Sequence, residues 1–177
     1  MGLLPPNEVI DTLDIPVLQR VIKQISRAGI GQGLVADFTM QKDRSPKQLS
    51  AVLQKLNDVL DESPVPQYEW PGLVATLGAD LLGQLLHISP SSLRRYHTGT
   101  RPTPDDIAAR LHFLALITGD LAGAYNDIGI RRWFIRKRTA LGNRSPADVL
   151  VKEWNPEDPG PLQVRQLARS LTSFSVT

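Results

Sequence analysis

The stretch from Leu82 to Arg101, which reads LGQLLHISPSSLRRYHTGTR, constrains the fold of this chain more than any other segment. Leu82 and Leu86 are four residues apart and share one face of a helix, while Gly83 allows a second helix to approach closely. A turn is expected at His87, because histidine tolerates the left-handed backbone conformation better than most residues. The spacing therefore predicts two short helices around a tight turn, a helix-turn-helix.

The second helix of this pair has clear start and stop signals. Ser89 is a good N-cap, and Pro90 suits the first helical position. Gly99 is expected to end the helix after about His97. We expect a helix from about 90 to 97.

The outward side of this second helix carries residues suited to DNA. Leu93 and either Tyr96 or His97 fall on the inward side at helical spacing, which leaves serine and arginine side chains outward. Arginine can hold the O6 and N7 atoms of guanine, and recognition helices contact bases through their N-terminal part. We therefore expect a DNA-binding surface formed by Ser89, Ser91, Ser92, Arg94, Arg95 and Arg101. An ordinary capped helix pair in an all-α domain has the same spacing, and this alternative stays open.

Further motifs follow in a fixed order: Trp133-Phe134, then TALG at 139–142, RSPADVL at 144–150 and a last apolar-periodic segment. In this order the stretch from about Trp70 to Phe174 resembles the Xre/MbcA/ParS-type antitoxins, which carry a C-terminal toxin-binding domain. The resemblance implies a type II antitoxin that occludes the active site of a RES-domain toxin, an NAD-consuming enzyme, and represses the shared operon. The NAD chemistry belongs to the toxin, so the resemblance implies neither a cofactor nor an enzymatic activity for this chain.

The resemblance puts the toxin contact in the C-terminal part of the chain. The basic run 131–138 can follow phosphates, or it can meet an acidic rim on a partner with Trp133 as an anchor. Trp133 can equally be a core residue. We expect toxin contacts at Trp133, Arg136, Arg165, Arg169, Phe174 and Thr177.

The rest of the chain predicts an all-α fold, since almost every boundary signal is a helix boundary. A proline-rich stretch at 62–67 indicates a linker. We expect a helical N-terminal extension at 1–65, a helix-turn-helix module at 66–128 and a toxin-binding subdomain at 129–177. Two leucine-striped helices in the extension are expected to form a homodimer, because a repressor needs two recognition helices about 34 Å apart.

Two boundaries within the helix-turn-helix module also follow from the sequence. Its first helix is expected at 73–77, opened by Trp70-Pro71. A long helix is expected to begin with Thr103 as its N-cap and Pro104 at its first position, and to act as the central scaffold.

Composition limits the remaining functions. The net charge is only +2, but ten basic residues stand against four acidic ones between Arg94 and Arg144. The three histidines have no metal-site spacing, the glycine run at 29–33 has no nucleotide-loop spacing, and no catalytic group is expected. The absence of cysteine, of a signal sequence and of a long apolar segment predicts a cytoplasmic protein without a membrane anchor. A stand-alone transcriptional regulator and a protein-interaction adaptor remain as alternatives to the antitoxin.

Overall fold

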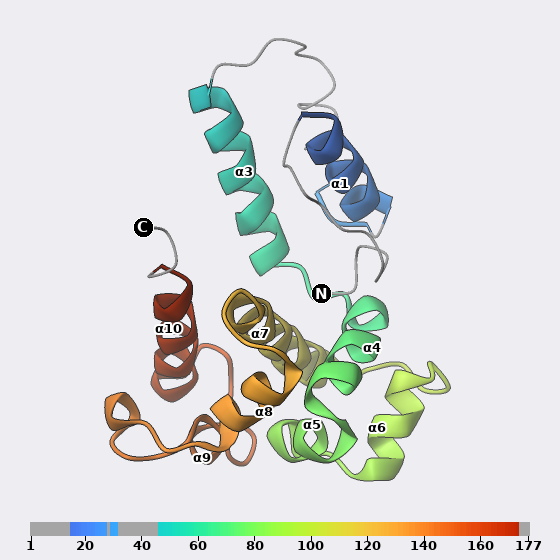
Figure 1. Ribbon diagram of the computed structural model, residues 1–177. Helices are drawn as coiled ribbons and strands as arrows, with labels where there is room; N and C mark the ends of the chain where they lie inside the picture. The colour runs from blue at the N-terminus through green and yellow to red at the C-terminus, as the bar shows by residue number, and fades with distance from the viewer. Residues whose placement is uncertain (1–14, 28, 32–45, 174–177) are drawn as a thin grey trace. The chain divides into compact units, whose positions relative to one another are not determined.

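The computed structural model describes residues 15–27, 29–31 and 46–173, and within them the regular secondary structure is helical (Figure 1). An isolated antiparallel bridge joins Arg138 and Arg144. The predicted all-α class is therefore confirmed. The chain divides into two compact units, Gly2–Val65 and Pro66–Thr177, and the division falls within the proline-rich stretch.

The described part of the N-terminal unit contains helices α1 (Ile15–Arg27) and α3 (Pro46–Asp61). Helix α1 buries one stripe of apolar side chains, Leu18, Ile22 and Ile25. This agrees with the striped helix expected there, because residues three or four apart share a helix face. Dimerisation through this unit stays a prediction.

The C-terminal unit is built around one long helix, α7 (Asp105–Ala122), which contacts α4, α5, α8 and α10. Figure 1 shows α7 running between α10 and α4. Its buried side chains point in several directions, as expected for a scaffold helix. The other elements are α4 (Pro66–Leu77), α5 (Ala79–Leu86), α6 (Pro90–His97), α8 (Asp127–Ile135), the 3-10 turn η1 (Thr139–Leu141), α9 (Pro146–Val149) and α10 (Pro159–Ser173).

A single apolar cluster extends through this unit from Trp70 to Ala168. The predicted border between residues 128 and 129 falls inside α8, and the residues on both sides of it share this cluster. The helix-turn-helix and the segment after it are therefore packed as one body.

Two helix starts differ from the predicted ones. Helix α4 begins at Pro66 and contains Pro71 in its interior, although an interior proline costs about 3 kcal/mol. Burial of Glu69 and Trp70 in this added turn offsets that cost. Thr103 does not cap α7, because its Oγ1 accepts a hydrogen bond of 3.0 Å from Trp70 Nε1, and Pro104 takes the N-cap position.

A buried polar pair joins α4 to α7. Glu69 Oε1 lies 2.6 Å from His112 Nδ1, and both side chains are almost fully buried. A buried charge or hydrogen-bonding group is stable only with a partner, so this pair fixes the register of the two helices. The pair is a core feature, as expected for His112.

None of the described helices has both the length and the apolar composition needed to cross a membrane; only α7 and α8 taken together reach it, and a bend of 119° separates them.

Candidate nucleic-acid interface

The turn between α5 and α6 has the backbone conformation that the sequence predicts. His87 adopts the left-handed region with φ 54° and ψ 44°, and its N–H donates to the carbonyl of Gln84. The N–H of Ile88 donates to the carbonyl of Gly83 at 3.1 Å. These bonds close the end of α5 and turn the chain toward α6.

The end of α5 is also held from distant parts of the unit. Trp154 Nε1 donates to the carbonyl of Leu85 at 2.8 Å, and Arg110 Nη1 donates to the carbonyl of Leu86 at 3.3 Å. Both carbonyls belong to the last turn of the helix, where partners inside the helix are lacking. Trp154 and Arg110 therefore fix the orientation of the first helix of the pair, a role that the sequence interpretation missed.

Helix α6 begins with a complete serine cap. Ser89 Oγ accepts from the backbone N–H of Ser92 at 3.2 Å, and Pro90 occupies the start of the helix. The same hydroxyl contacts Ser91 Oγ and Ser92 Oγ at 3.0 Å each. The hydroxyl of Ser89, a predicted DNA contact, is thus committed to the cap.

The inner face of α6 packs on α5 as expected. Leu93 and Tyr96 are buried, and the Tyr96 ring stacks on Trp70 with centroids 6.2 Å apart. A methyl group on Gly83 would lie 3.4 Å from the Ile88 carbonyl oxygen and 3.7 Å from Leu93 Cδ1. A methyl therefore fits, but any larger side chain at this position would push the two helices apart.

The outer face of α6 is exposed and basic. Ser91, Arg94 and Arg95 are exposed, and within the described residues neither arginine side chain has a hydrogen bond or an ion pair. Thr98 and Thr100 donate from their hydroxyls to the carbonyls of Arg94 and Arg95 and so close the end of the helix. Both guanidinium groups are free to reach a base edge or a phosphate.

The other predicted DNA contacts lie at the edges of this face. Ser92 is partly buried on the side toward the core. Arg101 is exposed, and its guanidinium carbon lies 5.7 Å from the centre of the Tyr96 ring. This cation–π contact directs Arg101 along the C-terminal end of α6.

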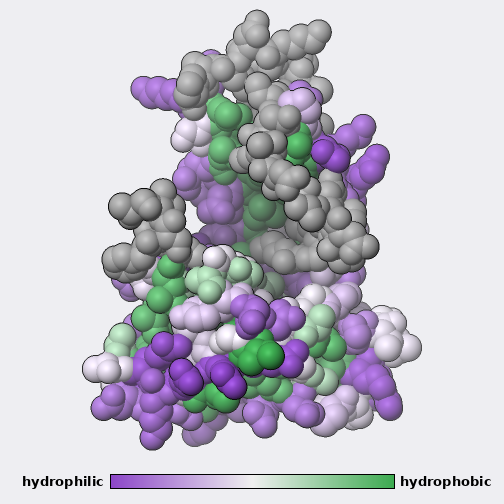
Figure 2. Space-filling view, in the orientation of Figure 1, coloured by the Kyte–Doolittle hydropathy of each residue, from purple (hydrophilic) through white to green (hydrophobic). Residues whose placement is uncertain are grey.

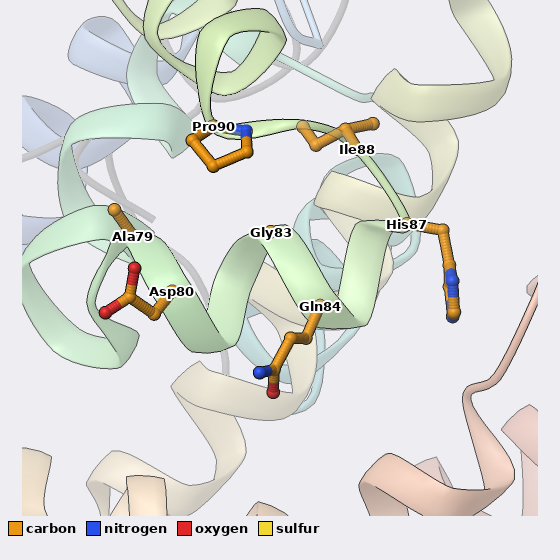
Figure 3. Close-up of a pocket in the computed structure, with 7 residues that line it drawn as sticks. All are labelled: Ala79, Asp80, Gly83, Gln84, His87, Ile88 and Pro90. Atoms are coloured by element: carbon orange, nitrogen blue, oxygen red, sulfur yellow. The ribbon is translucent and has the colours of Figure 1, made fainter.

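A shallow open groove lies between the two helices of the pair (Figure 3). Ile88 and Pro90 face α5 across it in that view, and Asp80, Gln84 and His87 are exposed on α5. Its polar groups do not include a nucleophile held against a base. The groove is therefore the space between two packed helices, without the constellation of a catalytic site.

The predicted partner residues are scattered over the C-terminal part. Trp133 is 1% exposed, lies edge-on to Phe134 with centroids 5.2 Å apart, and has Arg138 over its ring at 5.5 Å. It is a core anchor and offers no surface to a partner. Arg136 is exposed after the end of α8, and Phe174 and Thr177 lie outside the described residues.

Two further predicted contacts lie on α10. Arg165 is partly buried, whereas Arg169 is exposed and forms an ion pair with Asp120, with Nε and Oδ2 3.8 Å apart. The structure therefore does not bring these arginines and Trp133 together on one exposed surface.

The basic run contains one arginine with a clear structural role. Arg131 Nε donates to the carbonyl of Thr76 at 2.6 Å, and its Nη2 donates to the carbonyl of Ala75 at 2.8 Å. These are carbonyls of the last turn of α4, so Arg131 is a helix cap supplied by another helix.

The SPAD motif forms a capping box at the start of α9. Ser145 N donates to Asp148 Oδ2 at 2.9 Å, and Asp148 N donates to Ser145 Oγ at 3.0 Å. The hydrogen bonds from Ser145 lower the pKa of the Asp148 carboxyl. One motif on which the resemblance depends thus has a local structural explanation.

Comparison of the chain with protein-family models, with curated proteins and with solved structures finds no match.

Proposed function

We propose that this chain is a DNA-binding antitoxin, which represses its own operon through α5 and α6 and occludes a RES-type NAD-consuming toxin through its C-terminal part. The observation that carries the DNA-binding half is the exposed arginine pair on a capped helix. Arg94 and Arg95 stand on the side of α6 opposite Leu93 and Tyr96, and their side chains have no partner among the described residues. A recognition helix needs such free donors at its outer face.

The toxin-binding half is supported by the order of motifs that resembles the Xre/MbcA/ParS-type antitoxins. An antitoxin that acts by occlusion needs a surface complementary to the toxin and no catalytic group of its own. We therefore assign this chain no cofactor, and we assign the NAD chemistry to the partner.

The second candidate is a stand-alone helix-turn-helix regulator without a toxin partner. The capping box at Ser145 and Asp148 favours it, because this box gives the SPAD motif a role within the fold that needs no toxin. Both candidates use the same DNA-binding surface.

A gel-shift assay on the promoter of the chain's own operon tests the proposal. The full chain should shift this DNA in preference to an unrelated duplex of equal length. Addition of a RES-domain protein encoded in the same operon should change the shift, and the chain should abolish that protein's NAD consumption.

The outcomes separate the candidates. DNA binding together with inhibition of the RES-domain protein supports the antitoxin. DNA binding without any complex leaves the stand-alone regulator, and equal binding to both duplexes contradicts sequence-specific repression altogether.

A further inference from the structure

The outer face of α8 exposes large apolar side chains. Ile128 is 59% exposed and Ile135 is 60% exposed, although both belong to a regular helix. They are seven residues apart and lie on the same side of α8, with Arg132 exposed between them. We call these three residues the outer face of α8.

The opposite side of α8 already satisfies the core. Ile130, Trp133 and Phe134 are each buried to 2% exposure or less. Ile128 and Ile135 are therefore not needed for the packing of α8 onto the unit. Figure 2 shows hydrophobic surface bordered by hydrophilic side chains over α8. Exposed apolar surface with a polar rim is typical of a protein contact.

The rim of this face is positively charged. Arg136, Lys137 and Arg144 are exposed near it, and between residues 125 and 144 the only carboxylate is Asp127. Arg131 is bound to the end of α4, so the rim cations that remain available are the exposed ones. An occupant of this face needs carboxylates around an apolar centre.

This pattern argues against the other occupants. DNA presents phosphates and polar groove edges, to which a pair of exposed isoleucines adds nothing. In a two-fold symmetric pair of copies the same patch meets itself, which would bring Arg132 and the rim cations against their equivalents. Like charges opposed in this way disfavour a homodimer on this face.

We propose that the outer face of α8 is the docking surface for an acidic partner protein, whose apolar residues cover Ile128 and Ile135 while its carboxylates pair with Arg132 and Arg136. The inference rests on the proposed function, since the partner is the toxin. It moves the centre of the contact from the buried Trp133 to the exposed side of the same helix.

Titration of the full chain with the RES-domain protein of its operon tests this inference. The Ile128→Ser/Ile135→Ser variant should bind this protein roughly 100-fold more weakly, because both apolar anchors are lost. Arg132→Glu should bind about 10-fold more weakly at low salt, with a smaller difference at high salt. Val151→Ser is the matched control, since Val151 is 48% exposed on the same unit and outside this face.

Each variant is also assayed for DNA binding, which the intact fold should leave unchanged. If the α8 variants bind the RES-domain protein as tightly as the unmodified chain does, the inference is wrong while the proposed function stands. If the unmodified chain does not bind that protein at all, the proposed function and the inference fail together. If the isoleucine variant instead turns a dimer of the free chain into a monomer in sedimentation, the occupant is a second copy and the inference is overturned.

Discussion

Helices α6 and α8 are both rich in arginine and belong to one unit, yet they use these residues differently. On α6, Arg94 and Arg95 extend from the exposed side and contact no other described side chain. In the basic run of α8, Arg131 caps α4, and Arg138 lies over the Trp133 ring just after the helix ends. Arginine content alone therefore does not identify a nucleic-acid surface.

The difference lies in what the two helices bury. Helix α6 buries one narrow stripe, so its remaining sides are free to face a ligand. Helix α8 buries two large aromatic rings and leaves isoleucines exposed on its far side. We expect variants of α6 to change DNA binding, and variants of α8 to change either stability or protein binding according to the side on which they lie.

The largest expected effect is on the inner side of α8. Trp133→Ala should lower the free energy of unfolding by about 3–5 kcal/mol, because it leaves a cavity in the core. Ile135→Ala on the same helix should change it by less than about 0.5 kcal/mol, since Ile135 is exposed. Urea unfolding followed by circular dichroism measures both. Equal stability of the two variants would contradict the core role of Trp133.

The next effect belongs to α6. Arg94→Ala and Arg95→Ala should each weaken binding to the operator by about 1–3 kcal/mol if the side chain contacts a base edge. Loss of a phosphate contact would instead weaken binding to all sequences and reduce the salt dependence. Fluorescence anisotropy with operator and unrelated DNA at several salt concentrations distinguishes the two roles.

The matched control for this pair is Arg132→Ala/Arg136→Ala, which removes the same charge from α8. It should leave DNA binding nearly unchanged at moderate salt, because only a long-range charge effect is lost. If this control weakened DNA binding as much as the α6 variant, the basic run would belong to the DNA surface and the comparison of the two helices would fail.

The sequence predicted the helix-turn-helix well because its determinants are local. The cap at Ser89, the left-handed turn at His87 and the close approach at Gly83 each depend on residues a few positions apart. Such short-range signals are contained in the order of the residues. The all-α class follows from the same kind of signal.

The missed features join residues that are far apart in the chain. Trp154 bonds to Leu85 across 69 positions, and Arg131 bonds to Thr76 across 55. No periodicity or cap motif contains such contacts, because they arise only when the core brings helix ends together. Helix α4 was predicted too short for a related reason: the burial of Trp70 outweighs the local effect of Pro71.

A smaller effect separates two neighbouring arginines of α8. Arg131→Ala should lower the free energy of unfolding by about 1 kcal/mol, because two hydrogen bonds to the end of α4 are lost and the exposed carbonyls then bind water. Arg132→Ala should change stability by less than about 0.5 kcal/mol and affect only partner binding. Thermal unfolding of both variants checks this, and reversed effects would show that the roles assigned to these two arginines are wrong.

The smallest effect concerns the capping box and depends on pH. The pKa of Asp148 is lowered in the folded chain by its hydrogen bonds to Ser145, relative to about 3.9 for an unfolded aspartate. The carboxylate therefore adds stability at pH values above the unfolded pKa, and this contribution is lost as the pH falls through the lower folded pKa. Asp148→Asn keeps an oxygen acceptor but no titrating group, so its melting temperature should lie below that of the unmodified chain at neutral pH and approach it in acid. Glu157→Gln, which removes an exposed carboxylate without a side-chain hydrogen bond in the described residues, should leave this difference unchanged. A melting-temperature difference for Asp148→Asn that stays constant from about pH 7 to about pH 2.5 would mean that the capping box does not lower this pKa.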